Sequence, residues 1–217
     1  ISVGLQIGTQ PPLNATRAFV LGARAMRLDS VMAIDHYQNI FPSVIWDEHL
    51  TWLAAHRATP YEFFDYQVLL GYLASRVGQM WIGVGVTEPI RRHPVLIAQA
   101  IMTLSHLTKK APILGIGAGE RMNIDPYGLD PSEPVTRVEE ALQIIRLCLS
   151  TTGPITFCGK HYRLDQATMD LKPAPGRVPE IWIAGHGPRM LELTGRYGDG
   201  WYPTTVASPP EYAAKLA

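Results

Sequence analysis

Short apolar runs alternate with longer amphipathic segments along most of the chain. The runs at residues 2–8, 30–34, 80–86, 112–117, 180–184 and 200–202 predict strands. The segments between them predict helices over 61–76, 94–107, 135–149 and 188–197, with others beginning near Asn14 and Pro209. Asn14 is placed to cap the first helix, whose Ala18, Leu21 and Ala25 would face inward. This alternation predicts a parallel sheet with helical crossovers.

Two segments interrupt the alternation and predict insertions at about 36–60 and 151–178. The first is a long loop rich in aromatic residues and histidine, and loops of that length in compact domains are usually functional. In the second, runs at 155–158 and 161–164 flank Gly159 and Lys160 and predict a hairpin. The whole of residues 1–217 is expected to form one domain with these insertions.

Two α/β architectures fit this order of elements. A doubly wound sheet usually has a glycine-rich phosphate turn after its first strand, and none follows Ile7 and Gly8. A (β/α)₈ TIM barrel needs about 250 residues, so six strand–helix units in 217 residues favour a barrel cut after about six units. The missing initiator Met and a final helix that has just begun also suggest part of a longer protein.

Composition excludes several classes of protein. Apolar residues make up 47% of the chain and charged residues 18%, which is typical of a globular fold. The 19 basic and 19 acidic residues cancel and form no basic run, so a nucleic-acid partner is not expected. No apolar run is long enough for a transmembrane segment. Cys148 and Cys158 predict unpaired, buried thiols and a cytoplasmic protein.

Chemically useful residues follow the predicted strands, where a barrel places its active site. Asp35 and His36 follow the second strand, and the pair predicts a histidine near neutral pH beside a ligand, with Asp35 orienting it or the ligand. A capped strand end with a surface histidine is the alternative. Gly85, Val86 and Thr87 end the third strand, where the glycines predict a bulge that backs a flat ring or a packing adjustment in the barrel wall.

The fourth and fifth predicted strands end in glycine-rich turns. Residues 115–120 have the spacing GxGxG and therefore fail the dinucleotide fingerprint GxGxxG. Instead, Glu120 and Asn123 would supply polar groups to a flat ligand, unless Glu120 only pairs with Arg121 or Arg91. The turn after the fifth strand predicts either an anion-friendly nest or a tight structural turn; it consists of Ala184, Gly185, His186 and Gly187. No metal-ligand spacing or nucleophile elbow is present, so neither a metal site nor a hydrolase is expected.

At these residues the sequence resembles the coenzyme F420-dependent branch of the luciferase-like superfamily. The resemblance covers almost the whole chain and is most specific over residues 85–100 and 115–120. With residues 35–39, these segments are most similar to the mycobacterial phthiodiolone dimycocerosate ketoreductase group, and the F420-dependent sugar-phosphate dehydrogenases are more distant. His186 departs from the small residue of that dehydrogenase branch, which argues against a sugar phosphate as substrate.

The resemblance implies a barrel that holds a deazaflavin in its mouth, with a non-proline cis peptide near Gly85 and Val86. It implies that His36 and Glu120 are catalytic and that the cofactor is bound by Asp35, Gly85, Val86, Thr87, Asn123, Ala184, Gly185, His186 and Gly187. The expected function is hydride exchange between reduced F420 and a small-molecule or long lipid ketone, with the loop 36–60 walling a hydrophobic channel. The alternatives are an FMN-dependent monooxygenase and a non-catalytic ligand-binding barrel. A homodimer is common among such barrels.

Overall fold

The computed structural model describes residues 2–204 and 208–216 of the chain. Its main sheet has six strands in the order β1-β2-β3-β4-β7-β8, and all neighbouring pairs are parallel. They are β1 (Gly4–Ile7), β2 (Ser30–Ala33), β3 (Trp81–Thr87), β4 (Ile113–Ile116), β7 (Glu180–Ile183) and β8 (Gly200–Trp201). The order never reverses, as it would in a doubly wound sheet, so the winding is that of a (β/α) barrel.

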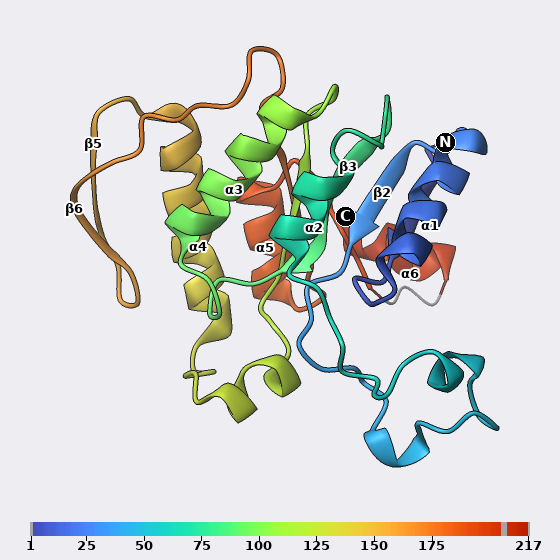
Figure 1. Cartoon of the computed structure of the whole chain (residues 1–217). Coiled ribbons are helices and arrows are strands. Elements are labelled where there is room, and N and C mark those ends of the chain that lie inside the picture. Colours follow the sequence, from blue (N-terminus) through green and yellow to red (C-terminus); the bar gives the residue numbers. More distant parts are fainter. Residues whose placement is uncertain (1, 205–207, 217) are drawn as a thin grey trace.

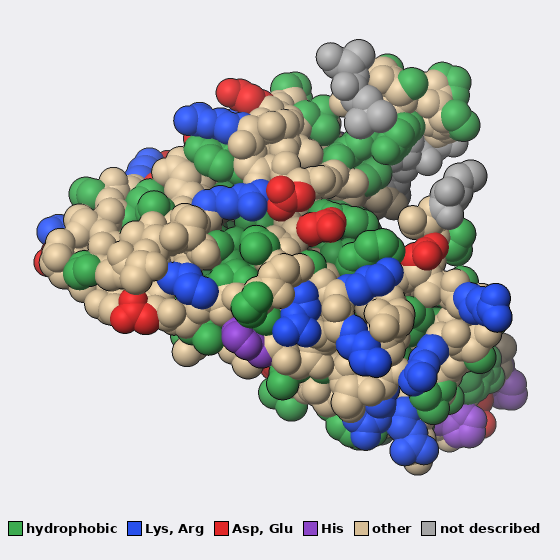
Figure 2. Space-filling model, turned by 90° about the horizontal axis from the view of Figure 1, so that it is seen from above, with side chains coloured by type: hydrophobic (Ala, Val, Ile, Leu, Met, Phe, Trp, Pro, Cys, Tyr) green, Lys and Arg blue, Asp and Glu red, His purple; other side chains and the backbone are tan. Residues whose placement is uncertain are grey.

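The helices follow one another around the outside of this sheet (Figure 1). They are α1 (Leu13–Ala25), α2 (Tyr66–Leu73), α3 (Pro94–Leu107), α4 (Pro134–Ser150), α5 (Pro188–Tyr197) and α6 (Pro209–Leu216). The predicted bounds of α3 and α5 are confirmed, because each begins with a proline whose fixed φ and missing N–H suit the first helical position. Viewed from above, on the side where the strands begin, Lys and Arg side chains gather over one part of the surface (Figure 2).

The sequence prediction for α1 is wrong in two respects. The helix begins at Leu13, so Asn14 lies inside its first turn, and the preceding Pro12 makes no side-chain cap. Its buried residues are Thr16, Val20 and Ala23, whereas the predicted inward residues Ala18, Leu21 and Ala25 are exposed. Both sets recur at helical spacing, and the pattern alone does not tell which stripe meets the sheet.

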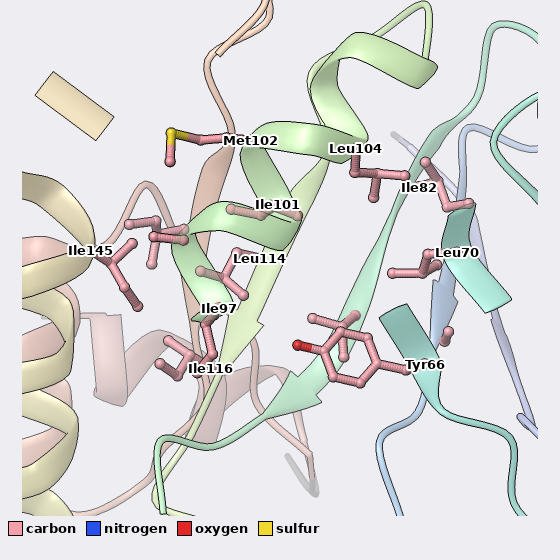
Figure 3. Close-up of a cluster of buried hydrophobic side chains, with 14 of the residues drawn as sticks. Tyr66, Leu70, Ile82, Ile97, Ile101, Met102, Leu104, Leu114, Ile116 and Ile145 are labelled. Atoms are coloured by element: carbon pink, nitrogen blue, oxygen red, sulfur yellow. The ribbon is translucent and has the colours of Figure 1, made fainter. Parts of the chain in front are cut away.

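The hydrophobic core lies between the sheet and the helices α2, α3 and α4 (Figure 3). Ile82 of β3 and Leu114 and Ile116 of β4 are each at most 1% exposed. They face Leu70 of α2 and a row from α3 and α4 that includes Ile97, Ile101, Met102 and Ile145. Gly83 and Gly115 allow β3 and β4 to approach, since a Cβ on either would lie 2.0 or 2.2 Å from a carbonyl oxygen of the neighbouring strand. Gly83 therefore serves the close packing of two strands in the barrel wall, which was one of the two predicted roles of these glycines.

Both predicted insertions contain irregular or separate structure. Residues 36–60 reach away from the carboxyl ends of the strands (Figure 1) and contain two short 3₁₀ helices, Ser43–Ile45 and Trp52–Ala55. The hairpin consists of β5 (Pro154–Cys158) and β6 (Arg163–Thr168) and lies beside α4. Both cysteines are free, but Cys158 is exposed because it lies on this outer hairpin, and only Cys148 is buried as predicted. Among the described residues, no helix is long and apolar enough to cross a membrane.

Candidate functional site

The carboxyl ends of β2, β3, β4 and β7 surround a cavity of about 290 Å³. Ten of the eleven predicted site residues line it, namely Asp35, His36, Gly85, Val86, Thr87, Glu120, Asn123, Ala184, Gly185 and His186. Gly187 is the exception, because it is exposed and lies directly before α5. Parallel strands deliver their ends to one edge of the sheet, which is why segments distant in the sequence meet here.

His36 and Glu120 lie next to each other in the lining of this cavity. His36 Nε2 lies 3.5 Å from a carboxylate oxygen of Glu120, and the two side chains are 23% and 54% exposed. His36 Nδ1 lies 2.9 Å from the Gln38 carbonyl oxygen. Since a carbonyl oxygen only accepts, this contact places a hydrogen on Nδ1 and leaves Nε2 as the acceptor of the neutral ring. Nε2 and Glu120 can therefore hold one proton between them.

Asn123 connects Glu120 to the turn that carries His36. Its side-chain oxygen accepts hydrogen bonds from the N–H groups of Tyr37 and Gln38 at 2.8 and 2.9 Å. Its amide nitrogen donates to Glu120 at 3.2 Å. Asn123 is 2% exposed, so these bonds fix the turn that carries His36. The alternative ion pairs of Glu120 are wrong, because Arg121 pairs with Asp125 and Arg91 pairs with Asp35 and Glu88.

Asp35 is a buried carboxylate neutralised by two arginines. It accepts a hydrogen bond from Thr87 Oγ1 at 2.7 Å, and it lies 3.0 Å from an Arg91 nitrogen and 2.9 Å from an Arg92 nitrogen. The ring of His36 is instead held by the Gln38 carbonyl. The prediction that Asp35 orients the His36 ring is thus wrong, because the two guanidinium groups occupy the Asp35 carboxylate.

Arg92 links Asp35 to the surface carboxylate Asp65. Burial lowers the pKa of Arg92, but the attraction of Asp35 and a hydrogen bond to Asp65 outweigh this and hold the pKa above its ordinary value. The guanidinium also lies 4.8 Å from the centre of the Tyr66 ring. Arg92 therefore stays charged at every pH at which the protein is folded.

The end of β3 forms the predicted bulge. The pairing of β3 with β4 shifts register between Val84 and Thr87, and the peptide between Gly85 and Val86 is cis. The prediction of a bulge and a non-proline cis peptide at this point is confirmed. The Gly85 carbonyl accepts a hydrogen bond from the Gln6 side chain at 2.9 Å.

The part of the cavity lining formed by the ends of β3, β4 and β7 has few long side chains. A Cβ on Gly117 would lie 3.3 Å from Val86 and 3.4 Å from Ala184, so the ends of β3, β4 and β7 already touch. Gly119 has a φ of +86°, which favours glycine. His186 closes this side, with one ring nitrogen 3.1 Å from Thr204 Oγ1 and the other 3.4 Å from Lys215 Nζ. This part of the lining therefore consists largely of backbone and small side chains, with His186 at one side.

Sequence reasoning missed three contributors to the site. Gln6 holds the Gly85 carbonyl, and Arg91 and Arg92 hold Asp35. A signal for Gln6 was available, because it is a polar residue near the carboxyl end of an otherwise apolar strand. The arginines gave no such signal, since charged residues in a loop are usually solvated. Within the described part of the chain, no group of His, Cys, Asp and Glu side chains could hold a metal ion.

The family model described as luciferase-like monooxygenase matches residues 2–217. The chain belongs to the luciferase-like monooxygenase family. It is 42% identical over 206 residues to a phthiodiolone/phenolphthiodiolone dimycocerosates ketoreductase of Mycobacterium sp., with 93% of this chain and 54% of the relative covered. It is 33% identical over 150 residues to a 5,10-methylenetetrahydromethanopterin reductase of Archaeoglobus fulgidus, with 69% and 43% covered. The chain thus spans about half the length of the curated relatives it matches.

Solved structures of this luciferase-like family share the fold. The coenzyme F420-dependent tetrahydromethanopterin reductase of Methanopyrus kandleri matches with a TM-score of 0.79 at 20% identity, over 100% of this chain and 59% of that one. An F420-dependent secondary alcohol dehydrogenase in complex with an F420–acetone adduct matches with a TM-score of 0.81 at 23% identity, over 99% and 63%. These likenesses confirm the predicted α/β barrel fold, of which the chain supplies six βα units.

Proposed function

We propose that the protein is an oxidoreductase that uses coenzyme F420 to interconvert a ketone and an alcohol. The observation that carries the proposal is the pair of His36 and Glu120, which lie 3.5 Å apart at the mouth of the cavity. The similar proteins also support it, since they include a ketoreductase and F420-dependent enzymes. When bound, F420 supplies the hydride that is exchanged with the substrate carbon.

The residues present fit a flat ring. Gly85, Val86, Gly117 and Ala184 leave backbone and small side chains on the walls of the cavity. Its volume of about 290 Å³ is at the lower end of ligand sites, which span about 300–1,000 Å³. This space suits a ring system. Asp35, Thr87 and Asn123 set the shape of the wall through the bonds described above.

The chain's own residues would move the proton. The His36 side chain is the more buried of the two, and the Glu120 side chain is the more exposed. We infer that His36 passes its Nε2 proton to the developing alkoxide and that Glu120 returns a proton from solvent to Nε2. Asn123 holds His36 and Glu120 close together through its hydrogen bonds to Glu120 and to the turn that carries His36.

The first test is a titration of the full-length protein with F420 and with FMN, followed by fluorescence. Micromolar binding of F420 with negligible binding of FMN supports the proposal. A preference for FMN moves the protein to the oxygen-using monooxygenases, and binding of neither leaves a non-catalytic barrel. The FMN alternative has support of its own, because a Baeyer–Villiger monooxygenase in complex with FMN matches with a TM-score of 0.69.

The second test replaces Glu120 with Gln, which keeps the shape and removes the proton-binding group. We expect kcat for ketone reduction to fall by about 100-fold or more, the usual scale for loss of general acid–base catalysis. The matched control is Glu139→Gln, which removes a carboxylate that pairs with Arg189 outside the cavity. Full activity in Glu120→Gln would remove Glu120 from the mechanism.

Three finer points belong to the same proposal. The substrate is a long-chain lipid ketone, supported by the exposed apolar side chains of residues 36–60 next to His36. The protein works as a homodimer. It acts in the cytoplasm, where two unpaired cysteines are stable.

A further inference from the structure

We propose that Tyr162, at the tip of the β5–β6 hairpin, is a positioning residue for the site. It holds the loop that follows β3, and through that loop it fixes Arg91 and Asp35 beside His36. The hairpin itself supplies no residue to the cavity lining. This inference rests on the proposed function for its effect on catalysis, but its structural part can be tested without any cofactor.

The tip of the hairpin is anchored to α4 by one carboxylate. Glu140, which is 7% exposed, accepts hydrogen bonds from the N–H groups of Lys160, His161 and Tyr162 at 2.7, 2.9 and 3.0 Å. These three bonds hold the pKa of Glu140 below its ordinary value although burial raises it. A Cβ on Gly159 would lie 2.3 Å from the Glu140 carboxylate, so only glycine lets the turn close over it. The tip is therefore a fixed point.

From this fixed point Tyr162 reaches the loop after β3. Its hydroxyl donates a hydrogen bond to the Pro89 carbonyl at 2.8 Å, and the side chain is buried. Its ring meets the ring of His93 edge to face, with 5.4 Å between the centres. His93 in turn accepts a hydrogen bond from the N–H of Val95 and so caps α3. Tyr162 thus contacts both ends of the segment from Pro89 to His93.

Within this segment Arg91 carries the connection to the site. The Glu88 carboxylate accepts from the N–H of Arg91 at 3.2 Å and binds its guanidinium. The guanidinium then donates to the Asp35 backbone carbonyl at 3.0 Å and pairs with its carboxylate. Asp35 directly precedes His36. A shift of Pro89 would therefore be transmitted to the backbone that carries the proposed proton donor.

A buried tyrosine that merely fills space would act differently. Tyr162→Phe keeps the ring and its contact with His93 and removes the hydroxyl, which donates to the Pro89 carbonyl and also has a hydrogen bond with Arg137 of α4. If the tyrosine is a filler, this variant changes nothing in the loop. If it positions the loop, the amides of residues 88–93 exchange with solvent about fivefold to tenfold faster, as the loss of one net hydrogen bond predicts. Ketone reduction then shows a lower kcat, since small misplacements of a reacting group are costly.

The experiment compares the full-length protein with its Tyr162→Phe and Gly159→Ala variants by hydrogen–deuterium exchange without cofactor. Tyr197→Phe is the matched control, because its hydroxyl accepts from Gln143 at 3.1 Å at the far end of α5. We expect faster exchange over residues 88–93 in both test variants, with no change there in the control. Denaturant unfolding of each variant checks that the whole protein is still folded.

Kinetic and binding measurements complete the test. For Tyr162→Phe we expect kcat for ketone reduction to fall about tenfold, with F420 binding changed by less than about threefold, as for a residue that orients reacting groups. Unchanged exchange over residues 88–93 in Tyr162→Phe overturns the inference whatever the cofactor. Faster exchange with unchanged kcat overturns the positioning role. Faster exchange in a protein that binds no F420 supports the link between hairpin and loop and contradicts the proposed function instead.

Discussion

Asp35 is a buried carboxylate that is compensated by positive groups packed directly against it. Arg91 and Arg92 approach it from one loop, and Thr87 approaches from the end of β3. Removing one member of a buried ion pair is more destabilising than losing a surface pair, since the partner's charge stays buried without compensation. At the scale of single residues, the site therefore depends on a buried cluster of charges beside His36.

Asp35→Asn tests this dependence. The amide keeps the size of the side chain but leaves the two guanidinium groups without their shared charge. We expect the free energy of unfolding to fall by about 3–5 kcal/mol, measured by denaturant unfolding. The control is Asp125→Asn, whose partner Arg121 is 79% exposed, and such surface pairs contribute about 0–1 kcal/mol. Equal losses in the two variants would contradict this account of Asp35.

The buried hydroxyl of Tyr66 leads to a second prediction, which concerns the stability of the fold at alkaline pH. Burial raises the pKa of its hydroxyl to about 12, and the charge of Asp35 adds to the effect. The unfolded chain loses this proton near pH 10, so the folded state is the better proton binder between about pH 10 and 12. The contribution is complete below about pH 10 and is lost as pH rises toward 12.

Tyr66→Phe should remove this part of the pH dependence. We expect the unfolding free energy of the unmodified protein to fall more steeply between about pH 10 and 12 than that of the variant, by up to about 3 kcal/mol for two pKa units. Denaturant unfolding at several pH values measures the difference, and tyrosinate absorbance gives the pKa directly. Parallel curves for the two proteins would show that Tyr66 ionises as easily in the folded state as in the unfolded chain.

At the scale of elements, Asp65 determines where α2 begins. The sequence predicted a helix from residue 61, but the Asp65 side chain accepts from the N–H groups of Gln67 and Val68, and the helix starts at Tyr66. Such a cap satisfies N–H groups of the first helical turn that would otherwise have no partner, and so it fixes the residue at which the helix begins. The other oxygen of Asp65 pairs with Arg92, so the cap also ties α2 to the charge network of the site.

Two substitutions separate these roles of Asp65. Asp65→Ala removes the cap and the ion pair, and we expect a loss of about 1–2 kcal/mol of unfolding free energy. Asp65→Asn keeps an oxygen that can cap the helix and loses only the charge, so most of the stability should return. Thermal unfolding of both variants measures the difference. If Asn and Ala destabilise equally, the ion pair with Arg92 is the main contribution.

At the scale of the whole molecule, an apolar surface lies next to the site. Residues 36–60 carry side chains that are largely exposed, among them Ile40 (69%), Val44 (86%), Leu50 (70%) and Trp52 (71%). Exposed apolar patches of this kind usually bind a ligand or partner. Under the proposed function this surface would receive the apolar chain of a lipid ketone.

Trp52→Ala tests that assignment. We expect KM for a long-chain ketone to rise by about tenfold, since burying a large side chain against a ligand contributes on the order of 1–3 kcal/mol. KM for a short ketone should stay unchanged, because the reacting groups lie in the cavity. Phe19→Ala, at an exposed position on α1, is the control. Equal changes for long and short ketones would assign Trp52 to the structure of the loop instead.

The surface opposite the site shows another effect that appears only in three dimensions. The chain contains no run of basic residues and has no net charge. Lys and Arg side chains from separate elements nevertheless gather on the side where the strands begin (Figure 2). This clustering therefore arises from residues that the fold brings together and cannot be read from spacing along the chain.

The sequence by itself determined the order of strands and helices, the barrel winding and the position of the site. Each strand is a short apolar run between turn residues, each helix has its own periodicity, and both signals are local. Because parallel strands bring their carboxyl ends to one edge, reading only those ends was enough to find His36, Glu120 and Asn123. The bulge at Gly85 was predictable from another local signal, the two glycines Gly83 and Gly85 near the end of the strand.

Only the tertiary structure decided which groups meet across the site. Asp35 binds Arg91 and Arg92 instead of His36, and Tyr162 reaches Pro89 from a hairpin 73 positions away. Neither contact has a signature in spacing or composition, because a side chain's partner is set by how separate elements pack. The buried stripe of α1 was predicted wrongly for the same reason. Local patterns determine the helices and strands. Which side chains become buried and which charged groups pair is decided only when those elements pack together.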